Sequence, residues 1–239
     1  GCNVPGALAG RILETRRERF IVATVMSICV PCMAQSAMIA ALVGSSSDSW
    51  LEIAAAFGAI FATLALTALV LSRLLNVAMR GESTELLIDI PPYRIPFMRG
   101  LVKKLVMRLW WFLREALPFV FLGVILIQLL ELTGVIALCG RLAAPVVENW
   151  LGLPREAVAG MVAGFLRKDM AVGMLQPLGL DWRQAAVASV VLTMYFPCVA
   201  TFSVLLKEFG VKDMGKAALL MVGTALAAGS LLNLALGAV

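Results

Sequence analysis

Two proline–cysteine pairs interrupt apolar stretches of this sequence, and each follows a hydroxyl residue at the same distance. They are Pro31 and Cys32 after Ser27, and Pro197 and Cys198 after Thr193. A proline inside a helix has no N–H to donate and clashes with the carbonyl four residues before it, so the carbonyls of Ser27 and Thr193 lose their helical partner. Carbonyl oxygens and thiols placed together in apolar surroundings predict a cation site.

Cysteine is the main metal-ligating side chain in this chain, which has five cysteines and no histidine. Thiolates are soft ligands that suit Fe(II), Zn(II) or Cu(I) better than Mg²⁺ or Ca²⁺. We assign metal contact first to Cys32 and Cys198 and then to Cys29, which forms a C-x-x-C pair with Cys32. The alternative for each is packing as a small buried hydrophobe. Cys139 has no partner motif and is expected to be structural.

Three further groups of polar residues are candidates for the same pathway. Cys2 and Asn3 precede a proline and bring a thiol and an amide, unless they form a loop at the chain end. Lys168 and Asp169 are predicted to form a charged pair that gates or couples transport, together with the breaks at Pro31 and Pro197. The alternative is a pair that solvates a helix end. Four polar residues line the path or bond a neighbouring carbonyl: Gln35, Ser36, Thr201 and Ser203.

The composition indicates an integral membrane protein. Of the 239 residues, 61% are hydrophobic and 15% are charged, against roughly 45–50% and about 25% in soluble domains. The net charge of +5 comes from loops between apolar spans, which excludes a nucleic-acid-binding patch. Without histidine no Ser-His-Asp or Cys-His arrangement exists, and no Gly-x-x-x-x-Gly-Lys-Ser/Thr motif occurs, so we do not expect an enzyme.

The apolar pattern predicts several membrane segments. We expect a broken helix over 20–44, a span over 51–72, a basic loop with an interfacial helix over 80–115, a connecting span and external loop over 116–154, a half-helix over 155–179, a broken helix over 184–206 and a last span over 217–239. The half-helix contains Arg167, Lys168 and Asp169. Each charge costs at least about 2.5–3.5 kcal/mol at the bilayer centre, so this segment is expected to re-enter the membrane without crossing it.

A re-entrant segment makes the two broken helices run in opposite directions. The predicted fold is therefore an all-α polytopic transmembrane bundle with two inverted repeats, proline-broken helices and a re-entrant half-helix. Inverted repeats with discontinuous helices are typical of secondary transporters, with the substrate site between the repeats. The positive-inside rule puts the basic loop 73–114 in the cytoplasm.

Four pieces of the sequence, in register along nearly the whole chain, resemble one known family. They are residues 1–5 with Arg11 and Glu14, residues 87–96, residues 164–169, and residues 197–201 with Lys207 and Glu208. These pieces resemble the membrane half of the FeoB-type ferrous iron transporters, which follows a cytoplasmic GTPase. The resemblance implies a first Gate repeat over 1–79 and a second over 155–239. One departure is that Cys32 is retained while Gln35 and Ser36 follow it, where the family has an arginine.

The resemblance also implies a biological role. We expect Fe²⁺ as the transported ion, no tightly bound cofactor, and a multi-pass location in a prokaryotic inner membrane. The expected partners are the lipid bilayer, a GTPase domain upstream on the same or a separate chain, small accessory Feo proteins and further copies of the chain. The chain itself is expected to be a piece of a longer protein. The alternatives are a Gate-type transporter of Mn²⁺, Zn²⁺ or a nucleoside, and a membrane scaffold that transports nothing.

Overall fold

The structure is a computed structural model that describes residues 2–79, most of 97–114, a few single positions between 121 and 145, and residues 147–166, 168–195 and 199–237. All regular elements in these parts of the chain are helices. Among the described residues, three helical stretches are long and apolar enough to cross a membrane. They are Arg16–Gly44, Trp50–Ala78 and Val204–Gly237. The all-α class and the membrane character predicted from composition are confirmed.

The first broken helix consists of α2 (Arg16–Cys29) and α3 (Met33–Gly44), and it follows α1 (Asn3–Ala9) and a short 3-10 turn, η1 (Gly10–Ile12). The chain leaves helical geometry between Cys29 and Met33, so the predicted break at Pro31 is confirmed. The helix starts earlier than predicted because Thr15 caps it, its Oγ1 accepting the backbone N–H of Glu18 at 3.2 Å. Part of the basic stretch is therefore helical.

Helix α4 (Trp50–Ala78) packs one narrow face against α2 and α9. Its buried residues recur at helical spacing: Ala56, Ile60, Leu64, Leu71 and Leu75. Because Leu75 continues this stripe, α4 runs beyond the predicted end at residue 72. Most of its other apolar side chains are exposed, as expected for a helix face that contacts lipid.

The region predicted as one half-helix is a helical hairpin. Helices α7 (Ala157–Leu166) and α8 (Lys168–Leu175) pack against each other and are followed by the 3-10 turn η2 (Gln176–Leu178). A Cβ atom added to Gly160 would lie 2.9 Å from Leu175 Cγ, and one added to Gly164 would lie 2.8 Å from Ala171 Cβ. These two approaches make the helices antiparallel, so the start and the end of the hairpin lie at the same end.

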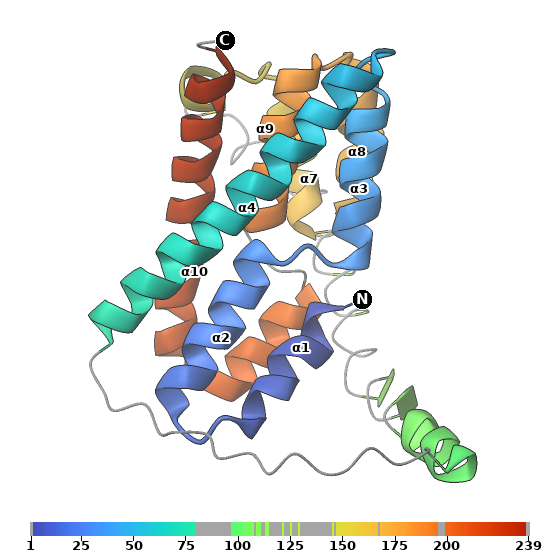
Figure 1. Cartoon of the computed structure of the whole chain (residues 1–239), viewed down its shortest axis with the longest axis vertical. Coiled ribbons are helices and arrows are strands. Elements are labelled where there is room, and N and C mark those ends of the chain that lie inside the picture. Colours follow the sequence, from blue (N-terminus) through green and yellow to red (C-terminus); the bar gives the residue numbers. More distant parts are fainter. Residues whose placement is uncertain are drawn as a thin grey trace.

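Helix α9 (Trp182–Met194) forms the centre of the bundle, with all residues from Ala185 to Met194 buried. It lies behind α4 in Figure 1 and packs against α10, α4, α3 and α2. Helix α10 (Val199–Gly237) bends at Gly210, whose φ of 80° and ψ of 171° are not helical. The predicted spans 184–206 and 217–239 are thus joined through this bend. Glycine is suited to it because positive φ strains other residues.

The two broken helices run in opposite directions (Figure 1). The Arg16 guanidinium at the start of α2 donates a hydrogen bond of 2.9 Å to the Phe209 carbonyl. Phe209 is the last residue of α10 before the bend at Gly210. Gln35, in the first turn of α3, instead contacts Thr193, near the end of α9. Later residues of the first broken helix therefore meet earlier residues of the second.

Candidate functional site

At the first break, the end of α2 is contacted by a side chain from another part of the sequence. The Val30 N–H makes the last helical bond of α2, to the Met26 carbonyl at 3.2 Å, while Pro31 has no N–H for the carbonyl of Ser27. The Asn3 side-chain amide donates to the Val30 carbonyl at 3.1 Å. Asn3 thus lies at the first break, and Cys2 beside it is an exposed free thiol.

The two cysteines of the first break have different surroundings. Cys29 is a buried free thiol that packs in the hydrophobic core. Cys32 is a half-buried free thiol that caps α3: its sulfur accepts the backbone N–H of Gln35. The backbone N–H of Cys32 in turn donates to Gln35 Oε1 at 2.8 Å. Cys32 therefore offers its sulfur at the break, whereas Cys29 takes the packing role.

The carbonyls near the second break accept hydrogen bonds from two buried side chains. The Gln35 amide donates to the Thr193 carbonyl at 3.0 Å, and Lys168 Nζ donates to the Leu192 carbonyl at 2.6 Å. Gln35 is 2% exposed, Lys168 6% and Thr193 0%. The Thr193 carbonyl is therefore not bare, because the first broken helix supplies a donor to it. Each carbonyl oxygen retains a second lone pair.

Lys168 is held at this position by the hairpin and by an aromatic ring. It is the first residue of α8, and its Nζ lies 5.7 Å from the centre of the Tyr195 ring. The Tyr195 hydroxyl donates to the Met161 carbonyl of α7 at 2.6 Å. An ammonium over an aromatic face is stabilised electrostatically. We call Gln35, Lys168, Thr193 and Tyr195 the polar bridge, since they join α3, the hairpin and the end of α9.

The hydroxyls before the two prolines make the same local bond. Ser27 Oγ donates to the Ala23 carbonyl and Thr193 Oγ1 donates to the Ser189 carbonyl, both at 2.7 Å. Each hydroxyl donates its hydrogen in this bond, so the lone pairs of its oxygen are still available to an acceptor-seeking partner such as a cation. The Ser189 Oγ, one turn before Thr193, is buried and has no hydrogen-bond partner in the described parts of the chain.

Some candidates from the sequence lie outside the described residues. These are Pro197, Cys198 and Cys139, and the side chains of Asp169 and Ser203. Within the residues that the structure describes, no group of three or more histidine, cysteine, aspartate and glutamate residues is arranged to hold a metal ion. The arrangement is instead one of carbonyl oxygens, hydroxyls and a thiol, which suits transient contact with a cation better than tight chelation.

Sequence reasoning missed Tyr195 and Ser189. Tyr195 lies between Thr193 and Pro197 in the sequence, but its contacts with Lys168 and Met161 depend on the folded hairpin. Ser189 precedes Thr193 by four residues, so a search for hydroxyl residues at helical spacing before each proline would have found it.

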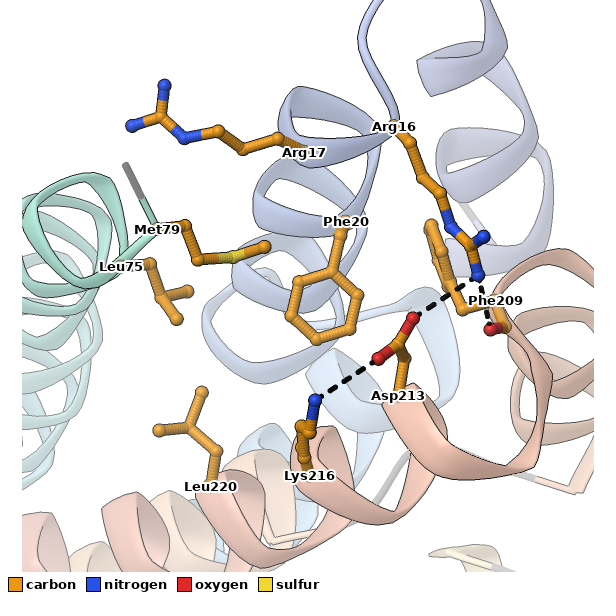
Figure 2. Close-up of a pocket in the computed structure, with 9 residues that line it drawn as sticks. All are labelled: Arg16, Arg17, Phe20, Leu75, Met79, Phe209, Asp213, Lys216 and Leu220. Carbon is orange, nitrogen blue, oxygen red and sulfur yellow. Dashed lines mark hydrogen bonds and ion pairs between the residues drawn. The ribbon is translucent and has the colours of Figure 1, made fainter. Parts of the chain in front are cut away.

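A second feature lies where α2 begins. Ion pairs join Arg11 to Glu208 at 2.7 Å and Arg16 to Asp213 at 3.2 Å. Beside them a cavity of about 380 Å³ separates the start of α2, the end of α4 and the bend of α10. Figure 2 shows Phe20 at its centre, with Arg16 and Lys216 both reaching Asp213.

Two family models match the chain. The Gate model, described as "Nucleoside recognition", matches residues 113–212. The FeoB_C model, described as "Ferrous iron transport protein B C terminus", matches residues 55–108. No solved structure matches the chain.

Several curated relatives carry the name "Fe(2+) transporter FeoB". The protein of Methanocaldococcus jannaschii is 25% identical over 249 residues, which cover 89% of this chain and 36% of the relative. That of Staphylococcus aureus (strain COL) is 26% identical over 245 residues, covering 87% and 35%. That of Escherichia coli (strain K12) is 26% identical over 199 residues, covering 74% and 25%. The chain spans about a third of the length of the first two relatives.

Proposed function

We propose that this chain, which matches the Gate and FeoB_C models and resembles FeoB relatives over most of its length, is a Gate-containing membrane portion of the FeoB family that transports ferrous iron across a prokaryotic inner membrane. The observation that carries the proposal is the polar bridge, in which Gln35 of the first broken helix binds the Thr193 carbonyl beside the second break. Antiparallel broken helices that meet at their breaks are what an inverted-repeat transporter needs at its substrate site. Fe²⁺ is here the cargo and not a resident cofactor.

The proposed path for the ion runs along the two breaks. Cys32 and Cys198 supply sulfur, and the carbonyls of Ser27 and Thr193 supply oxygen. Asn3 and Cys2 contribute at the open side of the first break, where the Asn3 amide already binds the Val30 carbonyl. Cys29 is assigned only a secondary part in binding the ion, because its thiol is buried in the hydrophobic core. Mixed sulfur and oxygen ligands bind Fe²⁺ without holding it too tightly to leave.

Lys168 is the proposed gate of this path, with Asp169 as its charged neighbour in the sequence. Its ammonium bonds the Leu192 carbonyl, next to the carbonyl of Thr193 that we assign to the ion. At an effective dielectric constant of 20, two unit charges 4 Å apart repel by about 4 kcal/mol, and a divalent ion doubles the effect. The ammonium must therefore move away when Fe²⁺ arrives, while Pro31 and Pro197 keep the helices broken.

The proposed topology has α7 and α8 as a re-entrant hairpin that enters and leaves on one side. Its support is the antiparallel packing of Gly160 and Gly164 against Leu175 and Ala171. The two repeats are then inverted, and the basic loop 73–114 lies in the cytoplasm. We propose that a GTPase domain upstream, small accessory Feo proteins and further copies of the chain act with this portion, which itself has no catalytic role.

A second candidate function follows from the description of the Gate model, which names nucleoside recognition. Transport of a nucleoside, or of Mn²⁺ or Zn²⁺, would use the same broken helices, whereas a scaffold would transport nothing.

The test is uptake of radiolabelled Fe²⁺ by cells that lack their own ferrous importer and express the full-length protein. We expect uptake that excess unlabelled Fe²⁺ suppresses and a nucleoside does not. Uptake of the nucleoside alone, or of nothing, would refute the proposal.

A further inference from the structure

The cavity at the start of α2 is built by three helices from both halves of the chain. Its walls are Arg16, Arg17 and Phe20 of α2, Leu75 of α4 with Met79 just after it, and Phe209, Asp213, Lys216 and Leu220 of α10. Its volume of about 380 Å³ falls within the roughly 300–1,000 Å³ of small-molecule sites. The Phe20 and Phe209 rings meet edge to face at 5.3 Å and form part of the wall.

The lining of this cavity is amphipathic. Apolar side chains form its centre, while three basic side chains and a single carboxylate form its rim. Figure 2 shows Arg17 on the side of α4 and Lys216 on the side of α10, with Phe20 between them. Arg17 Nη2 donates to the carbonyl and the side-chain oxygen of Asn76, both at 2.7 Å, which fixes the guanidinium near the end of α4.

The helices on either side of the cavity carry apolar side chains on their outer faces. Leu74 is 57% exposed and Val77 76% exposed on α4, and Leu219 is 79% exposed on α10. All three belong to helical stretches that are long and apolar enough to cross a membrane. In a bilayer these faces contact acyl chains, so the cavity is flanked by lipid at the level where basic residues begin.

We propose that this cavity binds the headgroup of an anionic phospholipid. The phosphate would contact Arg17 and Lys216, because guanidinium and ammonium groups bind phosphate strongly, and the first part of the acyl chains would contact Phe20, Leu75 and Leu220. Basic pockets between transmembrane helices are known sites for anionic headgroups. A lipid bound there would hold α2, α4 and α10 together, whatever substrate the protein carries.

The test measures which lipids stay bound to the purified full-length protein. The protein is reconstituted with equal amounts of phosphatidylcholine and phosphatidylglycerol, and its bound lipids are identified by native mass spectrometry. We expect a preference for phosphatidylglycerol of roughly tenfold or more, as two basic residues near an anionic headgroup predict. The double variant Arg17→Gln, Lys216→Gln should lose this preference. Lys212→Gln removes an exposed charge of α10 that does not line the cavity, so it should keep the preference.

A second variant tests the site without changing its charge. Leu220→Trp fills the cavity, so it should release the bound phosphatidylglycerol while every basic residue remains, and it decides the question if the double variant does not fold. Retention of the lipid preference in both variants would overturn the proposal. So would displacement of the lipid by millimolar inorganic phosphate, which would assign the cavity to a soluble anion.

Discussion

Replacement of Gln35 should weaken the contact between the two broken helices. Its side chain makes two bonds, one to the Thr193 carbonyl at 3.0 Å and one from the Cys32 N–H at 2.8 Å. Gln35→Met keeps the length of the side chain but removes both bonds. Because Gln35 and Thr193 are buried, water cannot replace the lost partner of the Thr193 carbonyl.

The size of the effect follows from the two bonds. Hydrogen bonds between membrane helices average about 0.6 kcal/mol and reach about 1.7 kcal/mol. The bond to Cys32 is part of a helix cap, and such caps contribute about 1 kcal/mol. Gln35→Met should therefore lower the free energy of unfolding by roughly 2–3 kcal/mol.

The assay is thermal unfolding of the full-length protein in detergent, with Fe²⁺ uptake measured in parallel. A loss of this size should lower the Tm of the membrane portion by about 4–12 °C, at roughly 2–4 °C for each kcal/mol. Ser36→Ala is the matched control, because Ser36 is exposed and next in sequence. If Gln35→Met has the same Tm and uptake as Ser36→Ala, the polar bridge does not hold the two helices together.

Three further predictions concern the hairpin and its lysine. Gly164→Ala should destabilise the protein by about 1–3 kcal/mol in thermal unfolding, because the added Cβ would lie 2.8 Å from Ala171 Cβ and 2.9 Å from Leu192 Cδ2. Gly173→Ala is the control, since a Cβ added there has nothing within 4 Å, and an equal effect of the two changes would contradict the prediction. Lys168→Gln should lower the KM for Fe²⁺ uptake by about tenfold or more, since removal of only 1.4 kcal/mol of repulsion gives that factor. Lys168→Arg keeps the charge and should leave the KM unchanged, whereas a raised KM in both variants would indicate a structural role. Single cysteines at positions 155 and 179 should react with an impermeant thiol reagent from the same side of the membrane, and labelling from opposite sides would refute re-entry.

The sequence predicted the first break because its cause is local. Pro31 removes a backbone donor in any surroundings, and the structure has the helix end at Cys29 and resume at Met33. Charges at positions 167–169 likewise argued against a crossing in lipid. The structure packs α7 against α8, and re-entry itself stays a prediction. The bend at Gly210 was missed because a glycine in an apolar run does not by itself disclose a positive φ.

The site was less predictable because its contacts join distant segments. Gln35 was one of four polar residues assigned either to the path or to a neighbouring carbonyl, and only the packing of α3 against α9 selects the Thr193 carbonyl for it. The burial of Lys168 depends in the same way on the hairpin and on Tyr195. Cys29 and Cys32 are three residues apart and would share a face of a continuous helix. Because α2 ends at Cys29, Cys29 packs in the core while Cys32 lies outside the helix at the break.

The most direct test of a cation path along the two breaks is Fe²⁺ uptake by Cys32→Ser and Cys198→Ser variants of the full-length protein. The measurement uses cells without their own ferrous importer and compares variants at equal membrane abundance, with Cys139→Ser as the control. We predict that both changes abolish uptake and that the control transports like the wild type. Wild-type uptake in all three variants would contradict the account, because the cysteines at the breaks would then serve only in packing.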